Sequence, residues 1–138
     1  MNKHLYSPHQ RMVHEFHAQF GIYTGEWPHL PPEYIKNIRI DLLLEELEEL
    51  RVASANGDIV GVADALGDLE FLVNGTALAW GIALEPIFQE VYRSNMTKAG
   101  GQKSQEPKVI KGSNFSPPDL EPLLEAQIPG EGAMFTTL

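Results

Sequence analysis

The stretch from Ile59 to Trp80 most limits how this chain folds, because it is almost wholly apolar yet holds two aspartates. An apolar helix of this length needs burial on most sides, so other helices must pack around it. At about 100° per residue, Asp64 and Asp68 lie one helical turn apart within the apolar stripe, and Glu70 and Asn74 lie opposite. We therefore expect a central helix that carries two carboxylates into apolar surroundings.

Proline, glycine and capping residues mark the ends of four longer helices. The expected helices run from Pro8 to Gly21, from Pro32 to Asn56, from Asp58 to Gly81 and from Pro86 to Lys98. Residues 119–127 are expected to add one or two helical turns, whereas residues 24–33 and 99–118 are expected to be loops. Because the period-2 alternation of strands is scarce, we expect an all-α fold.

The helix before the apolar one contains an acidic run, residues 42–50 (LLLEELEEL). Acidic residues on a helix usually form a solvated face, and helical angles test that interpretation. With Glu45 at zero, Glu49 lies near 40° and Glu46 near 100°, interleaved with the apolar positions. Glu48 lies near 300°, on the solvent side. Three of the four glutamates therefore share a flank with the core side, and Glu48 is ordinary surface.

Carboxylates beside a core are costly unless they are paired, hydrogen-bonded or bound to metal. The two helices carry five such groups, and basic residues nearby are too few to neutralise them. Hard oxygen ligands in this number favour Mg²⁺ or Mn²⁺. A di-iron site is the alternative, but its Glu-x-x-His pattern is missing here. The candidate metal ligands are Glu45, Glu46, Glu49, Asp64 and Asp68.

The fourth helix carries polar side chains on its apolar stripe. Asn95 and Lys98 follow Val91 at four and seven residues, whereas Arg93 lies on the opposite face. Next to an acidic metal site, an amide and an ammonium group suit a phosphate chain. The alternative is that both lie at a fraying helix end, where lysine is favoured by the helix dipole.

The overall charge excludes several function classes. The chain has 138 residues, a formal net charge of −9 and no cysteine. A nucleic-acid binder needs clustered Lys and Arg, so we expect no nucleic-acid partner. Without cysteine there is no disulfide, thiolate nucleophile or Cys-ligated metal. The first ten residues lack a secretory h-region and no apolar run is long enough to span a bilayer. We expect a cytoplasmic protein with no membrane partner.

Taken in order, these segments resemble the MazG-like all-α nucleoside triphosphate pyrophosphohydrolases, in particular the phosphoribosyl-ATP pyrophosphohydrolase-like sub-branch. The matching segments are HEFHAQFG (14–21), LLLEELEEL (42–50), VADALGDLEFLVNGTALAWGI (62–82), EVYRSNMTKAGG (90–101) and KVIKGSNFSPPDLEPLL (108–124). The family signature is Glu-Glu-x-x-Glu followed by Glu-x-x-Asp on the next helix. Asp68 matches the final Asp, but Ala65 stands where the second motif has Glu, and Asp64 precedes it. Tyr92 stands where the sub-branch has a histidine.

The resemblance implies a MazG-like bundle of four to five helices that assembles as a homodimer or homotetramer. It implies a catalytic domain over residues 1–105, with residues 106–138 as a loop and short helical extension of the same domain. The implied reaction cleaves the α–β phosphate bond of a (deoxy)nucleoside triphosphate. Two or three Mg²⁺ or Mn²⁺ ions would assist it, with Glu46 and Glu49 as catalytic residues. Asn95 and Lys98 would contact phosphate or sugar.

The resemblance also predicts that the nucleoside contacts the first helix and the loop after it. The candidates there are His14, His17 and Trp27, with Phe16 and Phe20 as alternative stacking or core residues. A zinc site at the two histidines would need further ligands that the sequence does not supply.

The substrate is left open by the sequence. Control of the deoxynucleotide pool, with dGTP or dUTP as substrate, suits a short bacterial or bacteriophage protein in the bacterial or host cytosol. Hydrolysis of phosphoribosyl-ATP in histidine biosynthesis is one alternative. A non-catalytic acidic interaction module is another, and it would depend on outward charges such as Glu48, Glu70 and Glu85.

Overall fold

A computed structural model describes residues 2–98 and 111–130, and it is entirely helical over those residues. The elements are a 3₁₀ helix η1 (Lys3–Leu5) and α-helices α1 (Pro8–Phe20), α2 (Glu33–Ala55), α3 (Ile59–Ala79), α4 (Leu84–Met96) and α5 (Glu121–Glu125). The expected all-α fold is therefore confirmed.

The helix boundaries follow the capping residues that the sequence displays. The Ser7 hydroxyl accepts a hydrogen bond from the Gln10 amide at 3.1 Å, and Gly21 ends α1 in the left-handed conformation with φ +64°. Asp58 caps α3 by accepting from the Gly61 amide at 3.0 Å. These side chains satisfy backbone groups that a helix end leaves without partners, so both ends are encoded locally.

The fourth helix differs from its expected bounds at both ends. It begins at Leu84, two residues before Pro86, and it ends at Met96 rather than at Lys98. Proline is accepted as the third residue of a helix because the first turn has no carbonyl partner for its missing N–H.

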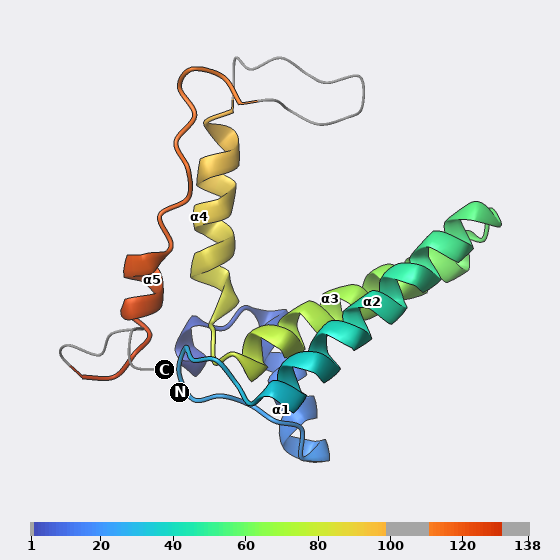
Figure 1. The fold of residues 1–138 in the computed structure, drawn as a ribbon, viewed down its shortest axis with the longest axis horizontal. Coiled ribbons are helices and arrows are strands. Elements are labelled where there is room, and N and C mark those ends of the chain that lie inside the picture. The colour runs from blue at the N-terminus through green and yellow to red at the C-terminus, as the bar shows by residue number, and fades with distance from the viewer. Residues whose placement is uncertain (1, 99–110, 131–138) are drawn as a thin grey trace.

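The helices form a long arm and a shorter, separate branch (Figure 1). Helices α2 and α3 run antiparallel along the arm, and α1 packs against its base. Helix α4 leaves the end of α3 across a bend of 114° and projects away from the arm. The far end of α4 and the middle of the arm are consequently well separated within one chain.

The core lies at the base, where the bend between α3 and α4 meets the N-terminal segment. It consists of Tyr6, Val13, Leu78 and Ala83, each less than 7% exposed. Two buried glutamine side chains hold the bend by bonding its backbone. Gln10 donates to the Ile82 carbonyl at 2.7 Å and accepts from the Leu84 amide at 2.9 Å. Gln127 pairs in the same way with the amide and carbonyl of Ala83, which attaches the C-terminal segment to the core.

The apolar helix α3 is less covered in one chain than its composition predicts. Ile59 and Val60 are 76% exposed and Leu66 is 52% exposed. The reason is that, among residues 2–98 and 111–130, only α2 packs along the outer arm, and α1 covers only the base. Exposed apolar side chains also occur on α2 and α4, including Leu44 and Phe88.

Within the described residues, no single helix is long and apolar enough to cross a membrane; α3 and α4 pass such a test only when joined across their bend.

Candidate metal centre

Three carboxylates from facing helices meet in the middle of the arm. They are Glu46 and Glu49 of α2 and Asp68 of α3, and one oxygen of each lies within 4.8 Å of the others. Glu46 and Glu49 share a face of α2 because three residues make nearly one helical turn. The helices approach closely here since their contact positions are small, with Ala65 2% and Ala53 9% exposed.

Glu46 is the most perturbed member of this cluster. Its Oε2 atom is buried and has no hydrogen-bond partner among the described residues. Its pKa is raised from 4.5 to about 7, first by desolvation, then by the adjacent side chain and charge of Glu49, and further by the charges of Asp68 and Asp64. Burial and like charges both disfavour the ionised form. The cluster therefore lacks a compensating positive charge.

Glu48, two residues along the same helix, has the opposite surroundings. Its carboxylate accepts hydrogen bonds from Nη2 and Nε of Arg51 at 2.6 and 2.9 Å, and both side chains are exposed. The hydrogen bond from Arg51 lowers the pKa of Glu48. Glu48 is an ordinary surface residue, as the helical angles predict.

The structure does not bring Glu45 and Asp64 into the three-carboxylate group, and both residues are exposed. Glu45 lies about 80° or more around α2 from the buried positions Arg39 and Ala53, which mark the contact with α3. Asp64 is close enough for its charge to raise the pKa of Glu46. Direct ligation by either residue stays a prediction.

Ala65 explains why the second acidic motif is incomplete. It occupies the position where the resembling family has a glutamate, and it is 2% exposed at the α2–α3 contact. A methyl group fills this place, so α3 contributes one carboxylate, Asp68, to the cluster.

The cluster fits a divalent cation on two grounds. Its donors are carboxylate oxygens alone, the ligand type that Mg²⁺ and Mn²⁺ prefer. The buried Glu46 oxygen without a partner is the kind of group that a cation would satisfy. The absence of histidine from the cluster disfavours a di-iron centre of the Glu-x-x-His type.

The predicted phosphate contacts lie elsewhere in the chain. Asn95 and Lys98 are at the far end of α4, which points away from the arm. With a rise of 1.5 Å per residue and a bend of 114°, Lys98 lies roughly 20 Å from the cluster of the same chain. One chain therefore does not bring these two residues and the carboxylates together.

None of the predicted nucleoside contacts belongs to the carboxylate cluster. His17 is 2% exposed, and its Nδ1 lies 3.2 Å from both the Tyr23 carbonyl and the Thr24 hydroxyl. Burial, followed by the charge of Arg39, lowers the pKa of His17 to about 4, so the ring is neutral near pH 7. The ring of His14 packs against that of Tyr6 with centroids 5.7 Å apart, and Trp27 is 40% exposed.

Neither histidine belongs to a potential metal cluster in the described part of the chain, so the zinc alternative gains no support.

Sequence reasoning missed the structural role of Arg39. This side chain is 6% exposed, and its guanidinium donates to the Leu72 carbonyl at 3.0 Å and the Thr76 hydroxyl at 3.2 Å. Gly75 makes room for it, because a Cβ there would lie 2.5 Å from the Arg39 Nη2 atom. The spacing of residues could have indicated this role, because Arg39 precedes Glu46 by two helical turns and therefore lies on the same face of α2.

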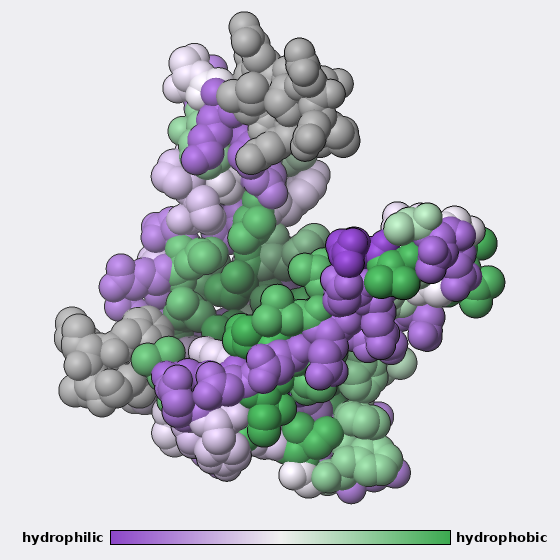
Figure 2. Space-filling view, turned by 45° about the vertical axis from the view of Figure 1, so that its right-hand side comes forward, coloured by the Kyte–Doolittle hydropathy of each residue, from purple (hydrophilic) through white to green (hydrophobic). Residues whose placement is uncertain are grey.

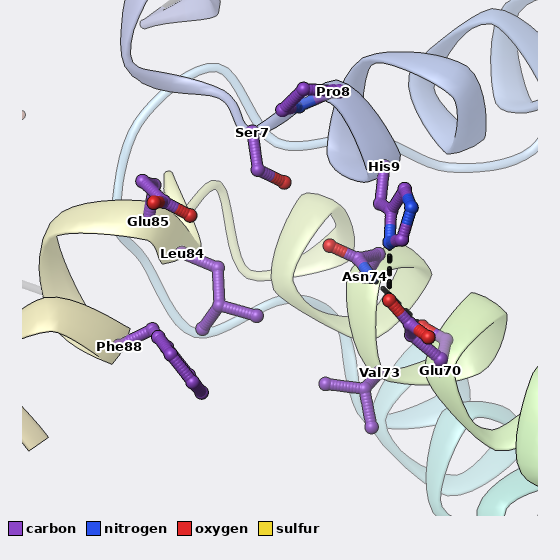
Figure 3. A pocket seen from close by; sticks show the side chains of 9 residues that line it. All are labelled: Ser7, Pro8, His9, Glu70, Val73, Asn74, Leu84, Glu85 and Phe88. Carbon is purple, nitrogen blue, oxygen red and sulfur yellow. Dashed lines mark hydrogen bonds and ion pairs between the residues drawn. The ribbon is translucent and has the colours of Figure 1, made fainter. Parts of the chain in front are cut away.

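A groove of about 440 Å³ lies between the start of α1, α3 and the start of α4 (Figure 3). Its polar side is an ion pair between His9 and Glu70, next to Asn74. Its other side is the apolar start of α4. The groove is lined by Ser7, Pro8, His9, Glu70, Val73, Asn74, Leu84, Glu85 and Phe88. It shares no residue with the carboxylate cluster.

Comparison with known proteins agrees with this geometry. The family model described as phosphoribosyl-ATP pyrophosphohydrolase matches residues 13–95, which include α2, α3 and the three clustered carboxylates. No curated protein matches the chain. The match covers more than half of the sequence. The chain therefore belongs to the phosphoribosyl-ATP pyrophosphohydrolase family, within the MazG-like nucleotide pyrophosphohydrolase superfamily.

Proposed function

We propose that this protein is a metal-dependent (deoxy)nucleoside triphosphate pyrophosphohydrolase, which converts its substrate into the nucleoside monophosphate and pyrophosphate. The observation that carries the proposal is the convergence of Glu46, Glu49 and Asp68 within 4.8 Å around a buried oxygen without a partner. Phosphoryl transfer depends mainly on positioning and charge neutralisation, and a cluster of hard oxygen ligands serves both needs.

In the proposed reaction the three clustered carboxylates would hold Mg²⁺ or Mn²⁺, and Asp64 and Glu45 would assist from the rim. When bound, two or three such ions would neutralise phosphate charge and lower the pKa of a water molecule. Glu46 and Glu49 would orient that water and accept its proton.

For the substrate, we propose a deoxynucleotide of the cytoplasmic pool, with dGTP or dUTP first. Phosphoribosyl-ATP, an intermediate of histidine biosynthesis, is the second candidate, and the family match is equally consistent with it. Both share the α–β phosphoanhydride bond, so the carboxylate cluster serves either substrate equally. His14, His17 and Trp27 stay proposed nucleoside contacts.

The test is a panel of common NTPs and dNTPs with phosphoribosyl-ATP, assayed with Mg²⁺ or Mn²⁺ for pyrophosphate release. Turnover of a deoxynucleotide above all others supports the first candidate, and selective turnover of phosphoribosyl-ATP supports the second. Release of orthophosphate would contradict the proposed chemistry. If no nucleotide is hydrolysed, and if binding of a partner depends on the outward charges of Glu48, Glu70 and Glu85, the non-catalytic acidic module would be favoured instead.

We further propose that the active unit is a homodimer or homotetramer. Figure 2 shows hydrophobic surface in the angle between α4 and the arm. Phe88, Tyr92 and Met96 of α4 and Leu44 and Leu47 of α2 are all more than half exposed. A second copy that covers this surface would bring the end of its own α4 toward the carboxylates, from which Asn95 and Lys98 of the same chain are distant.

Mixing two inactive variants tests this arrangement. If Asp68 and Lys98 of one site come from different chains, Asp68→Ala and Lys98→Ala proteins refolded together should recover about a quarter of wild-type activity. Half of the random dimers are mixed, and each has one intact site. Recovery of no activity, or a monomeric mass in solution, would contradict the proposal.

A further inference from the structure

Two lysines outside the family match converge on one aromatic ring. The ammonium groups of Lys98 and Lys111 lie 5.9 and 4.6 Å from the centroid of Phe115. The matched region ends at residue 95. The resemblance implies a phosphate or sugar contact for Lys98, but it gives no role to Lys111 or Phe115. The lysines are thirteen residues apart in sequence, and they meet because Ser116, next to Phe115, is hydrogen-bonded to Thr97 at the end of α4.

The ring is held in place by backbone bonds on both sides. A turn precedes it, in which the Phe115 amide donates to the Gly112 carbonyl at 3.2 Å. After it, Ser116 is fixed to the end of α4: its amide donates to the Thr97 hydroxyl and its carbonyl accepts from the Ser94 hydroxyl, both at 2.8 Å. Ser94 is 2% exposed, so this attachment is part of the packed structure.

The segment continues along α4 through two more hydrogen bonds. The Arg93 guanidinium donates to the Pro117 carbonyl at 3.1 Å, and the Asp119 amide donates to the Glu90 carboxylate at 3.2 Å. Phe115 is therefore a fixed platform at the tip of the branch.

The local charge is opposite to that of the whole protein. Lys98 and Lys111 both place a positive charge at Phe115, whereas the chain as a whole carries a net charge of −9. An aromatic face attracts ammonium groups, but it does not remove the repulsion between two of them. Two fixed cations at a short separation are complementary to a ligand with adjacent negative groups. A phosphoanhydride chain is such a ligand.

We propose that Lys98, Lys111 and Phe115 form a clamp for the terminal phosphates of the nucleotide, with Phe115 holding the two lysines in place. This inference rests on the proposed function, and the clamp would serve the carboxylate cluster of another copy. The β- and γ-phosphates are its ligands because they carry most of the negative charge, while the carboxylate side of the site holds the cations at the scissile bond.

The first experiment measures binding of inorganic tripolyphosphate by titration calorimetry in EDTA, so that metal bridges do not contribute. Lys111→Met and Lys98→Met should each weaken binding about tenfold, and Phe115→Leu several-fold, at low ionic strength. Lys111→Arg should retain most of the affinity. Lys3→Met, which removes the same charge from exposed η1, should change affinity less than about twofold.

Equal losses from Lys3→Met and Lys111→Met would overturn the clamp, because net charge alone would then explain binding. Unchanged affinity in Lys111→Met would also overturn it. A single-stranded oligonucleotide that binds more tightly than tripolyphosphate, through the same lysines, would identify a nucleic-acid surface instead.

A kinetic arm separates the clamp from the proposed function. If the protein hydrolysed no nucleotide, the proposed activity would be wrong. Tripolyphosphate binding in EDTA would still show whether the two lysines bind a phosphate chain. With an active substrate, Lys111→Met should raise KM and the inhibition constant of pyrophosphate about tenfold. Inhibition by the nucleoside monophosphate should stay unchanged, and an equal weakening of both products would contradict the assignment to the terminal phosphates.

Discussion

The two faces of α2 carry carboxylates of opposite character. On the outer face, Glu48 is paired with Arg51 and its pKa is lowered. On the inner face, Glu46 has a buried oxygen without a partner and its pKa is raised to about 7. The two residues are identical in type and two positions apart. Neighbours across the helix contact, and not residue type, therefore decide which carboxylate is prepared for a cation.

The same comparison separates the arm from the branch. The arm gathers negative groups between two facing helices, whereas the tip of α4 gathers two lysines on Phe115. The bend at residues 80–83 keeps these regions roughly 20 Å apart in one chain. A site that uses both charges must combine two copies, if the proposed function is correct.

Removal of an inner carboxylate should have the largest effect. Glu49→Ala or Asp68→Ala should lower kcat by about 100-fold or more, because each deletes a proposed metal ligand. Glu48→Ala should keep activity near wild type. Both inner variants should remain folded, and relief of repulsion should leave their melting temperatures equal or higher. Steady-state pyrophosphate release and circular dichroism check this. Equal losses from Glu48→Ala and Glu49→Ala would break the distinction between the faces.

Asp64 offers a finer comparison with Asp68, one turn away on the same helix. Asp64→Asn should lower activity about tenfold, less than Asp68→Asn, because Asp64 lies outside the carboxylate group and acts on it through its charge. The Mn²⁺ affinity of each variant, measured by calorimetry, should follow the same order. A larger loss from Asp64→Asn would mean that it takes the place of the family's glutamate.

The pKa of Glu46 predicts a pH-dependent stability without metal. Its pKa is about 7 in the folded chain and 4.5 ordinarily, so the folded state binds the proton more tightly. That contribution to stability is complete below about pH 4.5 and is lost as the pH rises through about 7. Thermal unfolding in EDTA between pH 6.5 and 8 should show this decline in stability. The window starts at the ordinary pKa of histidine, so that the titration of His17 contributes little to it.

Glu46→Gln should flatten this decline, and Glu48→Gln should not. Mn²⁺ at pH 7.5 should raise the melting temperature of the wild type more than that of Glu46→Gln, because the variant has lost one of the three carboxylates that would hold the ion. If the melting temperature fell equally steeply with pH in the wild type and in Glu46→Gln, Glu46 would not be the group that causes the decline.

The smallest effect belongs to the outer ion pair. Arg51→Ala should change the melting temperature by less than about 2 °C and leave activity unchanged, since exposed pairs contribute little. Differential scanning calorimetry at low and high salt measures it. A large loss of stability would show that the outer face is more than solvated surface.

Helix content was predictable because its signals are local. Ser7, Asp58 and Gly21 cap their helices as the sequence predicts, and helical angles separated Glu48 from Glu46. The same angles did not separate Glu45 from its neighbours, because the direction of the α3 contact depends on side-chain sizes on both helices. Burial of Arg39 and His17 was missed for the same reason: each is enclosed by elements distant in sequence.

The sequence alone determined the all-α class, the capped helix ends and the placement of acidic residues near the apolar faces, since capping and periodicity act within a few residues. Tertiary structure decided that Glu46, Glu49 and Asp68 meet while Glu45 and Asp64 stay outside, and that Lys98 joins Lys111 on Phe115 away from the acids. The physical reason is packing. The register of α2 on α3 and the bend before α4 depend on contacts such as Ala65, Gly75 and Gln127, which join residues far apart along the chain.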